Sequence, residues 1–175
     1  MFAPLLEKLH RREDLSVDEA AAAMAEIMDG RAQPSNIAAL LVALGMKGER
    51  PSEIVGLARV MRSRATALPF TSDAPDVFDT CGTGGDGADT FNVSTAAALV
   101  VAACGVRVAK HGNRSVSSRC GSADVFETLG VKIDASPSAA VRCLEQAGIA
   151  FLFAPTFHPS MRHAGPTRKE LGIRT

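Results

Sequence analysis

The sequence has neither tryptophan nor tyrosine, and it contains only eight phenylalanines among its 175 residues. Lysine plus arginine and aspartate plus glutamate number 19 each, so the formal net charge is zero. Proteins that bind nucleic acid usually present a basic surface and aromatic rings that stack on the bases. We therefore expect small-molecule ligands and no nucleic-acid partner.

Cysteine is also scarce, and no two cysteines stand in a Cys-x-x-Cys pair. Four dispersed thiols are too few for a disulfide scaffold, so we expect all of them to be reduced. Cys81 lies beside a glycine-rich loop, which leaves open a role as a nucleophile, although no histidine is close to it in the sequence.

Long apolar runs are absent. The run from Ala96 to Val106 is interrupted by Gly105 and is shorter than the roughly 18 residues that suggest a membrane span. The first fourteen residues carry charges within the first seven and lack the apolar core of a signal peptide. These features predict a cytoplasmic protein that does not bind membranes.

The first 68 residues have the pattern of helices only. Ser16 and Glu19 form a capping-box pattern, apolar residues then recur at helical spacing, and Gly30 ends the run. Two further helical patterns, at 34–49 and 52–68, each have proline and serine at their start. We expect a helical subdomain over 1–70, whose small apolar faces either pack internally or form a homodimer surface.

The pattern changes at 68–80, where two prolines and several turn-forming residues interrupt the helical periodicity. Beyond this boundary, apolar segments typical of strands alternate with helical patterns, which predicts α/β units on a largely parallel sheet. We expect this partial α/β domain to span 75–175, after the all-helical amino-terminal subdomain. The expected strands are 77–80, 106–110, 131–134 and 149–153, and the expected helices are 93–104, 122–129 and 137–147.

The segment 79–105, DTCGTGGDGADTFNVSTAAALVVAACG, is a glycine-rich loop that leads into an alanine-rich helix. Glycine lets backbone N–H groups approach a ligand, and a helix N-terminus adds partial positive charge, so a phosphate is a suitable ligand. A simple tight turn remains the alternative. The dinucleotide fingerprint is disfavoured because no acidic residue follows at the required distance, and Ala88 stands where a nucleotide-triphosphate loop needs lysine.

Two groups of hydrogen-bond donors follow this loop. Asn92, Ser94 and Thr95 lie at the next helix start, where they either cap the helix or bind an anion. The segment KHGNRSVSS at 110–118 then supplies lysine, histidine, arginine and several hydroxyl groups. Ligands of parallel sheets bind beyond the carboxyl ends of the strands, so we expect both groups to converge on one phosphate-bearing ligand.

Five ordered motifs, GTGGD, NVST, KHGNRSVSS, GSAD and HPSMR, resemble the signature of the anthranilate phosphoribosyltransferases. The resemblance extends to RKELGIRT at 168–175 and therefore covers the whole chain. It implies transfer of a phosphoribosyl group from phosphoribosyl pyrophosphate to anthranilate, with release of pyrophosphate and assistance from Mg²⁺. It also implies a place in tryptophan biosynthesis and a homodimer.

The resemblance implies a role for individual residues. The anthranilate site would contain Gly82, Asn113, His158 and Arg168, with Arg168 matching the carboxylate, and Ser94 would also contact magnesium. The phosphoribosyl pyrophosphate site would contain Gly82, Gly85, Asp86, Thr90, Asn92, Val93, Ser94, Thr95, Lys110, His111, Gly112, Asn113, Arg114, Ser115, Val116, Ser117, Ser118 and Ser122.

This chemistry agrees with a sequence that is rich in donors and shows no catalytic triad. The aromatic amine is itself the nucleophile, so the protein mainly has to stabilise the leaving pyrophosphate. Two alternatives remain for individual residues. Arg168 fits a solvated helix charge beside Lys169, and a metal-ligand role for His158 and His163 is disfavoured because HPSMRH lacks the HExxH pattern.

Two other functions remain open at this point: a pyrimidine nucleoside phosphorylase-like enzyme, and a noncatalytic helical interaction module with an anion site. The main departure from the resemblance is length. The family has about twice this size, typical of a two-domain enzyme, and its second half supplies an adjacent Asp and Glu for Mg²⁺. We therefore expect an apparently truncated amino-terminal half with little activity alone.

Overall fold

The computed structural model describes residues 1–71, 75–82, 90–115 and 120–173, which form two compact units. The first unit contains Met1–Ala65 together with His158–Thr175, and the second contains Thr66–Phe157. The described residues 158–173 therefore pack with the amino-terminal helices. The first unit contains α1 (Phe2–His10), α2 (Val17–Met28), α3 (Pro34–Lys47), α4 (Pro51–Ser63), the 3-10 helix η1 (Pro159–His163) and α9 (Gly165–Leu171).

Helix α2 begins as the sequence predicts. The Ser16 hydroxyl accepts the Glu19 backbone N–H at 3.2 Å, and the Glu19 carboxylate accepts the Ser16 N–H at 2.9 Å. Each of the two bonds satisfies a donor that the helix start would otherwise leave unpaired. The helix ends at Met28, and Gly30 then takes a positive φ of 73°, which favours glycine.

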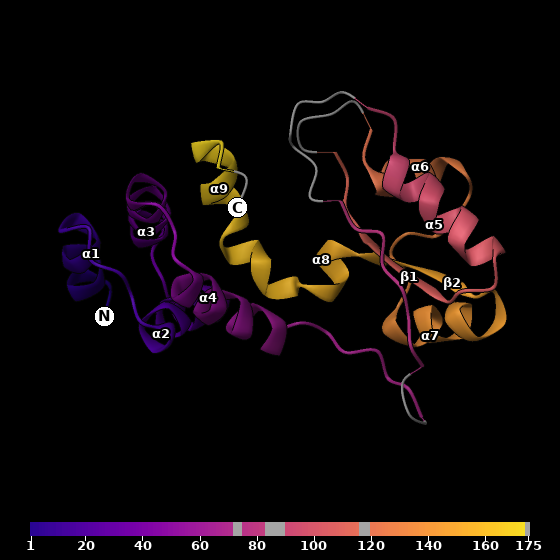
Figure 1. The fold of residues 1–175 in the computed structure, drawn as a ribbon, viewed down its shortest axis with the longest axis horizontal. Helices are drawn as coiled ribbons and strands as arrows, with labels where there is room; N and C mark the ends of the chain where they lie inside the picture. The colour runs from indigo at the N-terminus through magenta and orange to yellow at the C-terminus, as the bar shows by residue number, and fades with distance from the viewer. Residues whose placement is uncertain (72–74, 83–89, 116–119, 174–175) are drawn as a thin grey trace. The chain divides into compact units, whose positions relative to one another are not determined.

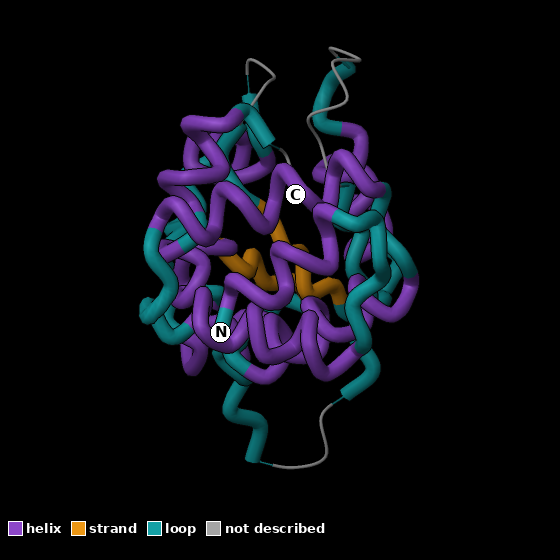
Figure 2. The backbone as a smooth tube through the Cα atoms, turned by 90° about the vertical axis from the view of Figure 1, so that its left-hand side faces the viewer, coloured by secondary structure: helices purple, strands orange, loops and turns teal. Residues whose placement is uncertain are grey.

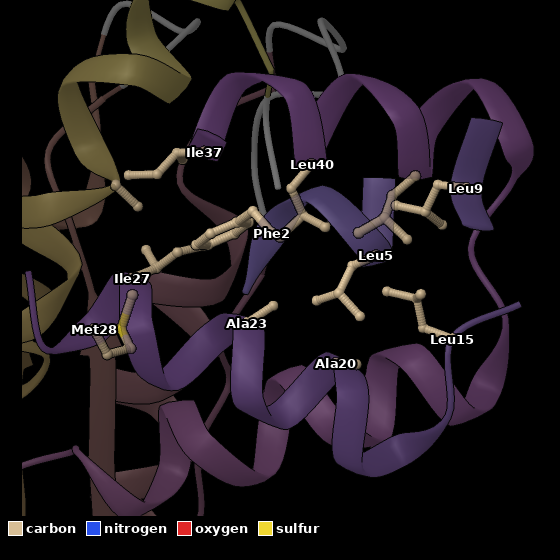
Figure 3. Packing of buried hydrophobic residues seen from close by; sticks show 12 residues of the cluster. Phe2, Leu5, Leu9, Leu15, Ala20, Ala23, Ile27, Met28, Ile37 and Leu40 are labelled. Atoms are coloured by element: carbon tan, nitrogen blue, oxygen red, sulfur yellow. The ribbon is translucent and has the colours of Figure 1, made fainter. Parts of the chain in front are cut away.

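The first unit packs around one apolar core, shown in Figure 3. Helices α1, α2 and α3 direct their apolar faces into it, and the returning segment contributes Ala164. Burial of these side chains provides the main stabilisation of the helical unit, since short helices are marginal in water without tertiary packing. The buried members of the core are Phe2, Leu5, Leu9, Leu15, Ala20, Ala23, Ile27, Met28, Ile37, Leu40, Leu44 and Ala164.

A buried carboxylate links three parts of the first unit. Glu53, in the first turn of α4, is fully buried. Its side chain accepts the Leu15 N–H at 2.9 Å, the Arg50 N–H at 2.8 Å and the Lys47 Nζ at 3.1 Å. Lys47 also reaches Asp14 at 2.9 Å. The carboxylate thus has both backbone donors and a cation, which is the condition for burying a charge without a large penalty.

Helices α2 and α4 touch backbone to backbone at Gly56. A Cβ atom there would lie 2.3 Å from the Val17 carbonyl oxygen and 2.9 Å from the Ala21 nitrogen. We expect Gly56→Ala to lower the free energy of unfolding by about 2 kcal/mol, because the helices must separate to admit the methyl group. The matched control is Gly45→Ala in α3, where nothing lies within 4 Å; there alanine should stabilise by about 1 kcal/mol. Urea unfolding measures both, and equal effects would contradict the close packing.

The second unit is a small parallel sheet between helices. It contains α5 (Val93–Ala103), β1 (Val108–Gly112), α6 (Ser122–Thr128), α7 (Pro137–Gln146), β2 (Ile149–Phe153) and α8 (Ala154–Phe157). Strands β1 and β2 pair in parallel, with Lys110 opposite Phe151. Figure 1 shows α5 and α6 on one side of the strands and α7 on the other, and Figure 2 marks the strands in orange.

Two expected strands do not form, and one expected helix is shorter. The segment 131–134 forms no strand, and its Ile133 is buried in a cluster with Ala123, Phe126 and Phe151. The segment 77–80 contributes only an isolated parallel bridge from Phe78 to Val108. Helix α4 ends at Ser63 rather than near residue 68. At both places a single apolar side chain is buried without regular structure. Ile133 is buried although Val131 is exposed, and Leu68 is half-buried against the core of the second unit.

Candidate functional site

The second unit buries a lysine in its sheet. Lys110 is only 1% exposed, and its Nζ donates to the His111 carbonyl oxygen at 2.7 Å. Over the described ranges, no carboxylate lies within ion-pair distance of it. A buried charge without a counter-ion is costly, and such a charge in a folded protein commonly marks a site for a ligand of opposite sign. Lys110 therefore fits an anion such as a phosphate.

The start of α5 adds hydroxyl groups to this unit. Thr95 is 1% exposed, and its Oγ1 has no hydrogen-bond partner in the part of the chain that the structure describes. Asn92 is the residue before the helix, but its side chain does not cap it; its Nδ2 donates to the Cys120 carbonyl oxygen at 3.1 Å. The NVST motif thus leaves a buried hydroxyl available for a ligand, rather than using its side chains as caps.

Thr80 and Gly82 lie close to the same helix start. The Thr80 hydroxyl donates to the Ser94 carbonyl oxygen at 2.7 Å, and a Cβ placed on Gly82 would lie 3.9 Å from Ser94 Oγ. The bond from Thr80 thus holds the segment before the glycine loop against the first turn of α5. Gly85 and Asp86, which the sequence also assigned to this loop, lie outside the described residues.

The Cys81 thiol has a histidine neighbour that the sequence order did not reveal. Its Sγ lies 3.8 Å from His111 Nδ1, and the Asp79 carboxylate accepts the His111 backbone N–H at 3.3 Å. Partial burial raises the pKa of the Cys81 thiol above its usual range, and the Lys110 charge opposes that effect. A thiol with a raised pKa stays protonated at neutral pH, so the arrangement disfavours the nucleophile hypothesis.

The segment after β1 holds its arginine in ion pairs. Arg114 Nη1 lies 2.9 Å from Asp124 Oδ1 and 2.8 Å from Glu127 Oε2, and Nη2 donates to Glu127 Oε1 at 3.0 Å. These bonds raise the pKa of the guanidinium, which is charged in any case. The Gly121 N–H lowers the pKa of Asp124, with Arg114 adding to the effect, and Arg114 lowers that of Glu127.

We expect this cluster to lose its stabilising effect in acid. A carboxyl group whose folded-state pKa lies below its unfolded value stabilises the fold above the unfolded value, near pH 4. That stabilisation disappears as the pH falls through the folded-state pKa. Urea midpoints measured from pH 6 down to pH 2.5 should therefore fall less steeply in Glu127→Gln than in the parent chain. The control is Glu145→Gln, at an exposed residue with no ion pair in the described chain; a curve like that of Glu127→Gln would contradict the prediction.

The other predicted site residues fall into three groups. Gly112 lies at the end of β1, where a Cβ would come within 2.1 Å of Ser122 Oγ, so the backbone closely approaches the start of α6. His158 and Arg168 lie in the first unit, before η1 and on α9, and both are half-buried. Of the rest, Thr90, Val93, Asn113 and Ser115 are described in the second unit, whereas Val116, Ser117 and Ser118 lie outside the described residues.

The described residues do not by themselves make a magnesium site. Ser94 offers one hydroxyl, and the described chain contains no group of three or more histidine, cysteine, aspartate or glutamate side chains placed to hold a metal. Mg²⁺ prefers an octahedral set of oxygen ligands and commonly combines carboxylates with substrate phosphates. A lone hydroxyl falls short of that set.

Sequence reasoning missed Asp124 and Glu127, which lie on α6 and fix Arg114. The GSAD motif did carry a signal for the first of them. The backbone N–H of the residue just before a helix is often accepted by an acidic side chain three positions later. Here the Asp124 carboxylate accepts the Gly121 N–H at 2.8 Å. The contact to Glu127 depends on the fold and has no such local signal.

Two family models together match most of the chain. The helical bundle domain of the glycosyl transferase family matches residues 3–65, and the α/β domain of that family matches residues 74–175. Among the described helices, none combines the length and apolar character needed to cross a membrane. The helical bundle and the parallel α/β units of the fold thus correspond to the two domains of a family of glycosyl transferases. The chain belongs to the glycosyl transferase family.

Individual relatives carry a more specific name. Anthranilate phosphoribosyltransferase from Moorella thermoacetica is 57% identical over all of this chain and 51% of its own length. The crystal structure of anthranilate phosphoribosyltransferase from Thermus thermophilus has a TM-score of 0.87 and 49% identity, covering 97% of this chain and 51% of that one. The Saccharomyces cerevisiae enzyme in complex with PRPP and Mg has a TM-score of 0.85 and 28% identity, with 98% and 51% coverage. The chain therefore spans about half the length of the relatives it matches.

Proposed function

We propose that the chain belongs to an anthranilate phosphoribosyltransferase and binds the phosphoribosyl donor in its second unit. The observation that carries this proposal is the buried Lys110, which has no carboxylate partner in the described chain and stands in the same unit as the unsatisfied hydroxyl of Thr95. A cation and a hydroxyl that are buried in this way suit a phosphate or pyrophosphate group. The names of the relatives support the choice of phosphoribosyl pyrophosphate as that ligand.

The proposed reaction requires electrostatic stabilisation more than a nucleophilic side chain. The amine nitrogen of anthranilate forms a bond to C1 of the ribose, the bond from C1 to the pyrophosphate oxygen breaks, and the amine loses a proton. Negative charge grows on the leaving pyrophosphate, where Lys110 and hydroxyl donors stabilise it. This account needs no nucleophilic thiol, in agreement with the raised pKa of Cys81.

The remaining assignments carry over from the sequence resemblance. His158 and Arg168 are proposed to bind anthranilate, with the guanidinium of Arg168 facing its carboxylate. The Ser94 hydroxyl is proposed as one protein ligand of the Mg²⁺ that would accompany the pyrophosphate of the donor and offset its negative charge. The proposal also includes a place in tryptophan biosynthesis, a cytoplasmic location and a homodimer formed through the helical unit.

The exposed apolar residues of the helical unit support the homodimer. Val42 and Met46 on α3 and Ile54 and Val55 on α4 are all at least 40% exposed. We propose that these side chains contribute to the dimer surface, because exposed apolar patches commonly mark an interface. Sedimentation velocity at several concentrations tests this part of the proposal.

The first experiment measures donor binding and turnover with the 175-residue chain. We expect chemical-shift changes at Lys110 and Ser94 on titration with millimolar phosphoribosyl pyrophosphate and Mg²⁺, but little loss of anthranilate fluorescence. We expect turnover of anthranilate to be weak because the described chain offers few ligands for magnesium. Absence of any shift would contradict the donor site and favour a noncatalytic module, and family-like turnover would contradict the expected impairment. Release of thymine from thymidine and phosphate would instead indicate a nucleoside phosphorylase.

A further inference from the structure

Arg114 belongs to the KHGNRSVSS motif, but its guanidinium is already engaged by two carboxylates. Asp124 and Glu127 together carry two negative charges against its single positive charge, at distances of 2.8–3.0 Å. The three side chains therefore have a net charge of minus one. A group with that charge does not attract a pyrophosphate, so the role of Arg114 must be sought within the protein.

Asp124 makes further bonds that Glu127 does not make. Its Oδ2 accepts the Gly121 N–H at 2.8 Å and the Ser115 N–H at 3.2 Å, while its Oδ1 receives the Arg114 guanidinium. Ser115 follows β1 and Gly121 precedes α6. One carboxylate thus joins the outgoing and the returning ends of the connection between that strand and that helix.

The two ends of this connection are in direct backbone contact. A Cβ on Gly121 would lie 2.3 Å from the Ser115 nitrogen and 2.6 Å from the Asn113 carbonyl oxygen. The same carbonyl oxygen accepts the Ala123 N–H at 3.1 Å and the Ser122 hydroxyl at 3.3 Å. Only glycine permits this approach, and Asp124 supplies the charge-assisted bonds that hold it.

We propose that Asp124 is a positioning residue for the phosphoribosyl donor and that Arg114 acts through it rather than on the donor. By joining the two ends of the connection, Asp124 fixes Asn113 and Ser115 relative to Ser122, so that these donors meet the ligand in one arrangement. Fixing donors before the ligand arrives removes part of the ordering cost of binding. The inference rests on the proposed function, because it concerns residues assigned to the same ligand.

The test compares Asp124→Asn with Glu127→Gln in the ¹⁵N-labelled 175-residue chain. Both variants remove one negative charge beside Arg114, so any simple electrostatic effect on an anionic ligand has the same sign in both. Only the first weakens the bonds to the Ser115 and Gly121 amides. We expect Asp124→Asn to shift those amide signals, to speed their hydrogen exchange and to raise the Kd for phosphoribosyl pyrophosphate with Mg²⁺ about tenfold. Glu127→Gln should leave the Kd within about threefold of the parent value.

Two further variants separate positioning from direct contact and from loss of the fold. Asp124→Glu keeps a carboxylate at the third helical position, where glutamate also accepts the N–H of the residue before the helix, and should recover most of the affinity. Arg114→Gln should weaken binding no more than Asp124→Asn does. Each Kd is measured at a temperature where the amide spectrum shows the folded chain.

Each outcome decides the inference. Equal affinity of Asp124→Asn and the parent chain, or tighter binding by both charge-removing variants, would overturn the positioning role. A much larger loss in Arg114→Gln than in Asp124→Asn would show that Arg114 contacts the donor directly and would also overturn it. No donor binding by the parent chain would overturn the proposed function and this inference together, which distinguishes that failure from the others.

Discussion

Replacing Glu53 with alanine is expected to lower the free energy of unfolding of the helical unit by about 3–5 kcal/mol. The change removes a fully buried carboxylate, leaves the Leu15 and Arg50 backbone N–H groups without their acceptor, and removes one of the acceptors of the Lys47 ammonium group, which keeps Asp14. Lys47 is itself almost completely buried, with a side chain that is 4% exposed. Urea unfolding followed by far-ultraviolet circular dichroism measures the loss.

The control for Glu53 is Glu7→Ala, which removes an exposed ion pair between Glu7 on α1 and Arg11, the residue that follows this helix. Exposed pairs at this spacing contribute only about 0.3–0.5 kcal/mol, so the control should unfold close to the parent chain. A loss of similar size in both variants would mean that burial of the Glu53 carboxylate has no special importance.

Replacing Lys110 with methionine is expected to weaken donor binding while it stabilises the fold. The substitution roughly keeps the length of the side chain but removes a buried charge that donates a hydrogen bond to the His111 carbonyl oxygen. Relief of that burial should raise the free energy of unfolding by about 1–2 kcal/mol. Loss of a charge-assisted bond to a phosphate should raise the Kd for the donor about 10- to 100-fold.

The matched control is Lys132→Met, which removes the same charge from an exposed position of the second unit. Donor affinity should remain within about twofold, because exposed charges act weakly through water and salt. The effect at Lys110 should also be larger at low salt than at high salt. A destabilised Lys110→Met chain that binds the donor normally would show that the lysine has a structural role only.

The sequence predicts the helices of this protein better than its strands. The capping box at Ser16 and the prolines at Pro34 and Pro51 mark helix starts through local chemistry, and the structure confirms all three. Strand formation depends on a partner elsewhere in the chain, which the local pattern does not contain. The apolar residues at 131–134 illustrate this dependence, because Ile133 is buried among side chains without joining the sheet.

The candidate site shows the same division between local and long-range information. Lys110 is buried because nearly every residue of β1 is buried, and that follows only once the pairing with β2 is known. Arg114 was predicted as an anion donor from its residue type, but its two carboxylate partners lie ten and thirteen positions later on α6. The roles of the individual site residues remain predictions that the proposed variants can test.

The helical unit is discontinuous in the sequence, and this has a consequence for the order in which the chain folds. Its core contains Ala164 with Met161 packed against it, although its other members end at Val60. During synthesis the segment from Thr66 to Phe157 is complete before those two side chains emerge, so the second unit can reach its final contacts first. Until Met161 and Ala164 are synthesised, about a hundred residues after Val60, the core of the helical unit lacks these two side chains. Bringing them back to the core closes a long loop, which is slow. Folding of the amino-terminal helices is thus expected to finish last, although they are made first.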